Sequence, residues 1–139
     1  MTRTKKSIVK ELDKLAAEAV KLRDEHICQR CGRVASGCGC HWSHIYSRRR
    51  YCLRWDLLNA VVLCAGCHFW WHGNPIDAAA WFSKKFPARQ MYLDDLVMDD
   101  FGICIPRKNI VRPVKQAELL EIEKFLKAKV ELLKTETHF

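Results

Sequence analysis

The chain has 139 residues, 49% hydrophobic and 29% charged, which suits one globular domain with a modest core and excludes a disordered chain. With 24 Lys and Arg against 16 Asp and Glu, the net charge is +8, which favours a polyanionic partner such as nucleic acid. No stretch approaches the roughly 20 apolar residues of a membrane span, and no signal-peptide apolar core follows Met1. We therefore expect a single cytoplasmic domain over residues 1–139 with no membrane partner.

The first predicted element is an amphipathic helix within residues 5–24. Its apolar residues recur every three or four positions, with charges on the other face, at Ile8, Val9, Leu12, Leu15, Ala16, Ala19 and Leu22. This pattern predicts a helix that packs one face on the core.

Residues 25–74 form the second predicted part, and their composition differs. Seven of the eight cysteines and five of the six histidines lie between His26 and Gly73. Glycines interrupt its first half, so we expect no long helix there. The β-branched run 59–64, "NAVVLC", predicts a short strand. The run 67–73, "CHFWWHG", predicts the opening of a helix that ends near Gly73.

Residues 75–139 are predicted to be a helical extension. Asn74 is a favourable N-cap and Pro75 a favourable first helical residue, which predicts a helix over 75–86. A second helix is expected over 88–98, followed by a loop with an extended piece at 102–105. Pro113 is expected to open a last helix with one apolar stripe, made by Val114, Leu119, Ile122, Leu126, Val130 and Leu133.

Two Cys-x-x-Cys pairs predict a structural zinc site. The pairs are Cys28/Cys31 in "CQRC" and Cys64/Cys67 in "CAGC", and four thiolates complete a tetrahedral zinc shell. Disulfides are rare in the cytoplasm, which favours metal over bridges. Cys38 and Cys40 remain alternative ligands. The isolated Cys52 and Cys104 are interpreted as small apolar residues.

The run Cys64-x-x-Cys67-His68 also matches a c-type haem attachment pattern. Haem attachment of this kind requires an exported protein, and this interpretation leaves the pair Cys28/Cys31 without a role. We therefore favour zinc over haem.

The histidines form a second pattern. His68 and His72 are four residues apart, so on a helix they share one face and can bind one cation. Upstream, His44 precedes Asn59 by 15 residues, and Asn59 precedes His68 by nine.

The order His44…Asn59…His68…His72, with the cysteine pairs around it, resembles the HNH (ββα-metal) endonucleases. More closely, the stretch "CHWSHIYSRRRYCLRWDLLNAVVLCAGCHFWWHGNP" is similar to the NinG/Rap group of phage recombination nucleases. The resemblance covers residues 5–85, and a helical tail of similar character follows. It implies an α+β fold with a ββα-metal core on a four-cysteine zinc knuckle, flanked by N- and C-terminal helices.

The resemblance also implies a function. It is that of a metal-dependent DNA endonuclease of phage-type recombination, encoded by a phage and acting in the bacterial cytoplasm on branched or junction DNA. Junction cutting would favour a two-fold homodimer. RNA remains an alternative substrate. The rival function is a zinc-stabilised nucleic-acid-binding module without catalysis.

The same resemblance assigns residue roles. His44 would be the general base, Asn59 would hold the hairpin, and His68 with His72 would bind a catalytic Mg²⁺ or Mn²⁺. The chain departs from the family at Ser43, where a metal-binding Asp or His often stands. His41 is an alternative ligand, although on an extended strand it faces away from His44.

A run of arginines completes the predicted site. Arg48, Arg49, Arg50 and Arg54 are predicted to grip phosphates, with a solvated charged turn as the alternative. The tryptophans are expected to cover the small core, at Trp55, Trp70, Trp71 and Trp81.

Overall fold

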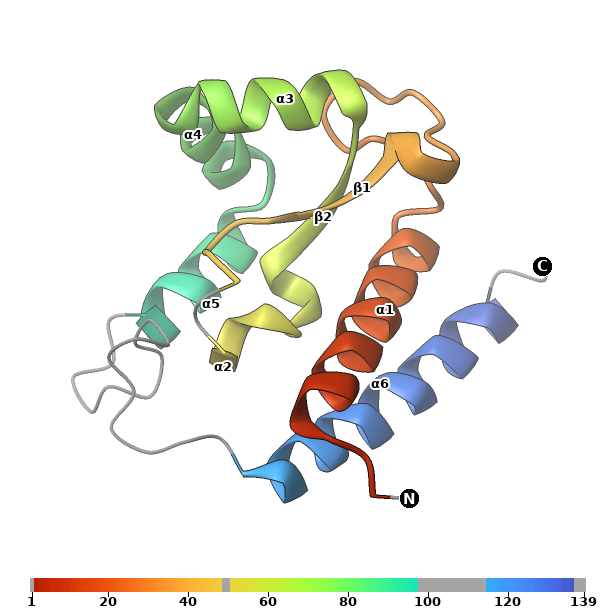
Figure 1. Ribbon diagram of the computed structural model, residues 1–139. Helices are drawn as coiled ribbons and strands as arrows, with labels where there is room; N and C mark the ends of the chain where they lie inside the picture. The colour runs from red at the N-terminus through yellow and green to blue at the C-terminus, as the bar shows by residue number, and fades with distance from the viewer. Residues whose placement is uncertain (1, 49–50, 98–114, 137–139) are drawn as a thin grey trace.

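The computed structural model describes residues 2–48, 51–97 and 115–136 (Figure 1). A two-stranded antiparallel sheet lies between a pair of long helices and an arc of shorter ones. The α+β class predicted from the sequence is therefore confirmed. The predicted extended piece at 102–105, Cys104, Pro113 and the arginines Arg49 and Arg50 lie outside the described residues.

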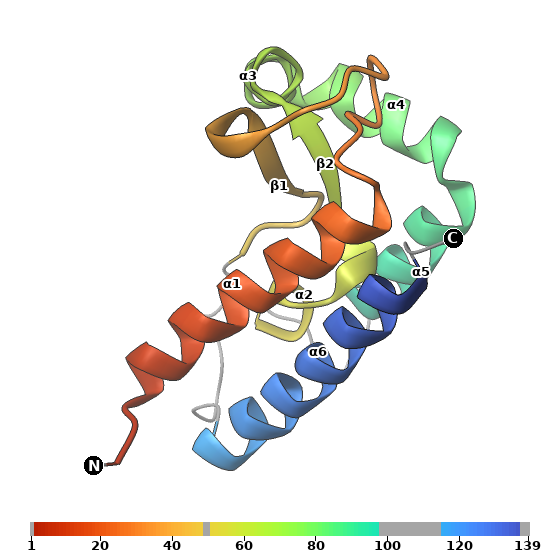
Figure 2. The same cartoon turned by 90° about the vertical axis from the view of Figure 1, so that its right-hand side faces the viewer.

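The long helices are α1 (Lys5–Arg23) and α6 (Gln116–Glu136). They lie side by side and run in the same direction (Figures 1 and 2). Arg3, just before α1, pairs with Glu123 early in α6, and Glu18 pairs with Lys134 near its end. Thr4 begins α1 by accepting a hydrogen bond from the Ser7 backbone N–H at 3.1 Å.

The predicted apolar faces of these helices meet. We call their shared cluster the helical core; its buried members are Ile8, Leu12, Leu15, Ala16, Ala19, Trp55, Leu119, Leu126, Val130 and Leu133. The apolar stripes read from the sequence are thus confirmed for the described residues. Spacing predicted which face each helix buries, because a helix repeats every 3.6 residues.

The strands are β1 (Cys40–His44) and β2 (Ala60–Cys64), paired from Cys40↔Cys64 to His44↔Ala60. All residues of β2 are buried, which confirms the strand predicted over 59–64. Asp24, at the end of α1, is buried and accepts a hydrogen bond from the Val62 N–H at 2.9 Å. This bond fastens the sheet to α1.

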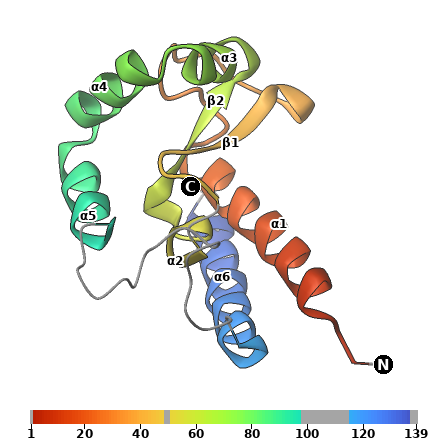
Figure 3. The same ribbon diagram turned by 60° about the vertical axis from the view of Figure 1, so that its left-hand side comes forward.

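Helix α3 (Ala65–Gly73) follows β2 without a loop, so the order is strand, strand, helix. Helices α4 (Pro75–Lys85) and α5 (Pro87–Val97) continue the arc. Figure 3 shows this arc on one side of the hairpin and α1 on the other. Within the described chain, no helix is both long and apolar enough to cross a membrane.

Asn74 is the N-cap residue of α4, as expected, and its carbonyl accepts a hydrogen bond from the Ala78 N–H at 2.9 Å. Its side chain makes no capping bond to α4, however, and its Nδ2 donates to the Trp70 carbonyl at 3.1 Å. Asn74 alone separates α3 from α4, so its amide serves the end of the first helix. Pro75 does occupy the start of α4, as expected.

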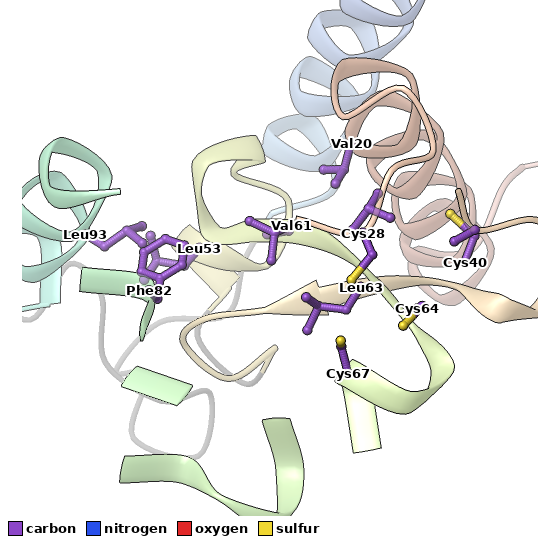
Figure 4. Close-up of a cluster of buried hydrophobic side chains, with 13 residues drawn as sticks. Val20, Cys28, Cys40, Leu53, Val61, Leu63, Cys64, Cys67, Phe82 and Leu93 are labelled. Carbon is purple, nitrogen blue, oxygen red and sulfur yellow. The ribbon is translucent and has the colours of Figure 1, made fainter. Parts of the chain in front are cut away.

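A second cluster, the hairpin core, lies around β2 (Figure 4). Its buried members are Val20, Cys28, Ala35, Cys40, Leu53, Ala60, Val61, Val62, Leu63, Cys64, Cys67, Phe82 and Leu93. The strands that form its centre are five residues long, so this core depends on its flanking loops and helices.

Candidate metal centre and histidine cluster

The four cysteines of the two Cys-x-x-Cys pairs come together. One sulfur from each of Cys28, Cys31, Cys64 and Cys67 lies within 4.8 Å of the others. The sulfur atoms of Cys31 and Cys64 are 3.7 Å apart. A tetrahedral zinc with Zn–S bonds of about 2.3 Å sets sulfur atoms about 3.8 Å apart. The cluster therefore fits a structural metal such as zinc.

The first pair is carried on a tight loop. The Gly32 N–H donates to the Cys28 carbonyl at 2.9 Å, and the Cys28 N–H donates to the Arg33 carbonyl at 2.8 Å. Gly32 has a φ of +77°, in the left-handed region that a residue without a Cβ adopts at little cost. The Gln29 N–H then donates to the Val62 carbonyl at 3.0 Å, which docks this loop on β2.

The second pair comes from the junction of β2 and α3. Cys64 ends the strand and Cys67 lies in the first turn of the helix. Figure 4 shows the sulfur atoms of Cys28, Cys64 and Cys67 directed toward one another, with Cys40 lying apart. Cys38 is exposed. The metal-binding group found among the described residues contains neither Cys38 nor Cys40, the alternative ligands.

Arg30 lies against this cluster and was not singled out in the sequence. Its Nη1 donates to the Cys67 sulfur at 3.5 Å, and its guanidinium lies 3.6 Å above the Trp70 ring. Burial raises the pKa of the Cys67 thiol, and the Arg30 hydrogen bond opposes that rise. Its position between Cys28 and Cys31 is the sequence signal by which Arg30 could have been found.

The pKa of the Cys28 thiol shifts in the opposite direction, downward. Burial alone would raise its pKa, but backbone hydrogen bonds from Cys31, Cys64 and Arg30 outweigh burial and lower the pKa. These donors stabilise the thiolate, which is the form that binds metal.

Three histidines meet between β1 and α3. The His68 Nδ1 lies 3.0 Å from the His41 Nδ1, and the His68 Nε2 lies 2.9 Å from the His72 Nε2. His41 comes from β1, and the other two come from one face of α3. The structure thus brings the alternative ligand His41 together with the predicted pair.

The three rings do not converge as the sulfur atoms do. His68 lies between its neighbours and turns a different nitrogen toward each. A tetrahedral metal with N-bonds of about 2.0–2.1 Å sets nitrogen atoms about 3.3 Å apart, close to both measured separations. The three rings thus form a chain through His68, and the group of converging metal-ligand atoms found among the described residues holds the four cysteines and no histidine.

His44 ends β1 and has different neighbours. Its Nε2 lies 3.2 Å from the Arg54 carbonyl, and its ring meets the edge of Trp42 at a centroid distance of 4.2 Å. Burial lowers the pKa of His44 to about 4, so the ring is neutral at pH 7. A neutral ring that donates Nε2–H to this carbonyl leaves Nδ1 as a proton acceptor.

Asn59 closes the connection between the strands. It is fully buried, its Oδ1 accepts from the Tyr46 N–H at 2.8 Å, and its Nδ2 donates to the Tyr46 and Leu53 carbonyls at 3.0 Å. The Asn59 side chain therefore holds the backbone of Tyr46, two residues after His44, in place. Ser43 is also buried, and its Oγ lies 3.4 Å from the His41 carbonyl.

The described arginines that are predicted to bind phosphate differ in how exposed their side chains are. The Arg54 guanidinium makes two hydrogen bonds to Asp13, at 2.9 and 2.7 Å, and its side chain is only 14% exposed. Arg48 is 56% exposed and lies 3.7 Å from Asp13. Within the described chain, Arg48 is thus the accessible member, and Arg54 links α1 to the hairpin connection.

The tryptophans also divide. Trp55 is buried in the helical core, as expected, and its Nε1 donates to Asp13 at 2.8 Å. Trp70, Trp71 and Trp81 are half-buried.

Comparison with family models, with curated proteins and with solved structures finds no match to the chain. What the site does must therefore be argued from its own geometry.

Proposed function

We propose that the protein is a metal-dependent DNA endonuclease whose cysteines hold a structural zinc and whose histidines form the catalytic site. The observation that carries the proposal is that His41, on the strand that ends in His44, meets His68 and His72 of α3. The hairpin, α3 and the loop that carries Cys28 and Cys31 thus supply a cysteine cluster and a separate histidine cluster. A purely structural zinc domain has no need of the second.

His68 would hold a Mg²⁺ or Mn²⁺ together with His72 or His41. When bound, the cation would stabilise negative charge on the scissile phosphate and the leaving oxygen. Ser43 is buried and turned toward a backbone carbonyl, which makes it a poor ligand. We infer that His41, on the same face of β1 two residues earlier, takes the place that Ser43 does not fill.

His44 would be the general base. Its Nδ1 accepts a proton from the attacking water, and the Arg54 carbonyl accepts Nε2–H and stabilises the imidazolium that results. The low pKa keeps His44 neutral before reaction. The negative charge of a bound phosphate raises this pKa and strengthens the base.

The substrate we propose is DNA, with branched or junction DNA implied by the resemblance to phage recombination nucleases. The net charge of +8 and the exposed Arg48 support a polyanionic partner. A phage origin, a cytoplasmic site of action and a two-fold homodimer belong to the same proposal.

The second candidate is a zinc-stabilised nucleic-acid-binding module without catalysis. Two observations favour it, namely the serine at position 43 and the His68 ring that divides its nitrogens between two partners. Such a module would bind DNA with strong salt dependence and never cut it.

The test is cleavage by zinc-loaded protein of a labelled four-way junction, its matching duplex and a matching RNA. Each is incubated with Mg²⁺, with Mn²⁺ or without added divalent cation. We expect cation-dependent cutting that falls by about 10²–10⁴-fold in His44→Ala. His68→Ala should lose cutting as well, and both variants should retain wild-type zinc. His26→Asn, an exposed histidine with a positive φ that Asn tolerates, is the control.

Binding without cutting under every cation would favour the binding module. Equal cutting by wild type and His44→Ala would show that the base is misassigned or that the activity is a contaminant.

A further inference from the structure

A pocket of about 270 Å³ opens beside the histidine cluster. It lies where the end of β1 meets α3, α4 and α5, and its lining includes Tyr46, Trp71, His72, Pro75, Ala79 and Gln90. His72 therefore belongs to both the pocket and the histidine cluster. A group bound in the pocket would therefore lie next to a phosphate bound at the histidine cluster.

The lining of the pocket is partly aromatic and carries little charge. The lining residues include no Asp, Glu, Lys or Arg. Trp71 and Tyr46 supply aromatic surface, and Gln90 supplies an amide. Pockets for drug-sized ligands measure roughly 300–1,000 Å³, so this volume favours a single ring system.

Hydrogen bonds to Asp94 hold the polar side chains of the pocket wall in place. Asp94 Oδ1 accepts a hydrogen bond from the Tyr46 hydroxyl at 2.5 Å and another from Gln90 Nε2 at 2.7 Å. The Trp71 ring meets the Trp81 ring edge-on at a centroid distance of 6.1 Å. A wall held in this way loses little freedom when a ligand enters, which favours binding.

We propose that this pocket receives one unstacked base of the nucleic acid whose phosphate lies at the histidine cluster. This inference rests on the proposed function and deepens it. A neutral aromatic base matches the neutral aromatic walls, and the amide of Gln90 can meet its polar edge. Bases at junctions and bulges cost least to unstack, so the pocket selects DNA that is not a perfect duplex.

The test fills the pocket from its exposed rim. Ala79→Phe puts a ring into the lining, and Ala80→Phe adds the same ring at the next exposed position of α4, which does not line the pocket. The probes are a duplex with one unpaired 2-aminopurine and the same duplex fully paired. Binding and 2-aminopurine fluorescence are measured on zinc-loaded protein without Mg²⁺ or Mn²⁺, so that nothing is cut.

We expect wild type and Ala80→Phe to raise the fluorescence of the unpaired probe and to bind it about tenfold more tightly than the paired duplex. Ala79→Phe should lose the fluorescence rise and the preference, with unchanged affinity for the paired duplex. Gln90→Leu, which keeps the pocket open, should weaken only the binding of the unpaired probe.

Equal binding of the two probes by wild type, or an unchanged preference in Ala79→Phe, would overturn the pocket and leave the proposed function standing. Absence of any DNA binding by the wild type would overturn both. A far-UV spectrum and zinc content equal to wild type show that a variant is folded.

Discussion

The helical core and the hairpin core reach stability by different means. The helical core joins two long helices, of 19 and 21 residues, through a continuous apolar stripe. The hairpin core is built on two five-residue strands and contains three of the four clustered cysteines, Cys28, Cys64 and Cys67. It also relies on Asp24 and Asn59, two buried polar side chains that hold backbone groups. Apolar area stabilises the first region, whereas the second adds buried polar hydrogen bonds and a cysteine cluster that fits a structural metal such as zinc.

The candidate catalytic residues and the long apolar helix pair thus lie in different regions of the molecule. Every candidate catalytic residue lies in or beside the hairpin region, and the helical pair braces that region through Asp13 and Asp24. A structural metal at the cysteine cluster would let this small unit fix side chains without a large core, and the helices compensate for its small apolar area.

The largest effect should come from breaking the cysteine cluster. We expect Cys64→Ala to lose bound zinc and the fold of the hairpin region, because structural zinc sites contribute roughly 10–16 kcal/mol of apparent binding energy at pH 7. Zinc content and hydrogen exchange measure this, and protection in α1 and α6 should persist longest. Cys38→Ser, at an exposed cysteine outside the cluster, is the control. A full complement of zinc in Cys64→Ala would contradict the assignment.

A cavity in the helical core should act without touching the metal. Leu126 is fully buried between the helices, so Leu126→Ala should lower the free energy of unfolding by about 2–5 kcal/mol. Zinc content should stay at the wild-type value. Leu132→Ala, on the half-exposed side of α6, should change stability by less than about 0.5 kcal/mol in the same urea titration. Loss of zinc in Leu126→Ala would show that the two regions are not separable.

The pH dependence of His44 distinguishes the hairpin region again. Burial lowers its pKa to about 4 in the folded protein, against about 6.5 unfolded, so the unfolded chain binds more protons between these values. Stability should therefore fall as pH drops from 6.5 to 4, by up to roughly 3 kcal/mol from this group. An NMR titration with a His44 midpoint near 6.5 would contradict this.

Asp13 connects the two regions and should show an intermediate effect. Burial alone would raise its pKa, but hydrogen bonds from Arg54 and Trp55 lower it overall. The stabilisation is present above the ordinary Asp pKa and is lost as pH falls through the lowered folded value. Asp13→Asn should cost about 1–3 kcal/mol at pH 7 and progressively less in acid. Asp95→Asn, at an exposed aspartate, should cost little, and an equal loss in both variants would refute the link.

The smallest effect should come from Arg30. Removing its hydrogen bond to Cys67 in Arg30→Ala should weaken zinc binding about 10-fold to 100-fold, as loss of outer-shell partners does. Competition with a chromogenic chelator measures the affinity. Arg33→Ala, an exposed arginine next to the same loop, is the matched control. Equal zinc affinity in Arg30→Ala and wild type would reduce the contact to a surface pairing.

Local patterns were sufficient for part of this protein. Helical periodicity placed α1 and the buried stripe of α6, and β-branched composition placed β2, because these signals act over a few residues. The two cysteine pairs, with their matched spacing, predicted the metal cluster without knowledge of the fold. The pairing of His68 with His72 followed in the same way from four-residue spacing on a helix.

Other features were decided only by tertiary structure. That His41 joins His68 depends on the register of β1 against β2 and on where α3 packs. Arg54, predicted to bind phosphate, faces Asp13 because α1 passes beside the hairpin connection. The Asn74 amide bonds to the end of α3, while the Asn74 carbonyl begins α4, since two helices meet at one residue. The sequence by itself determined α1, the buried stripe of α6, the strand β2 and the cysteine pairs, whose signals are local, and only packing between distant segments decided which other side chains meet.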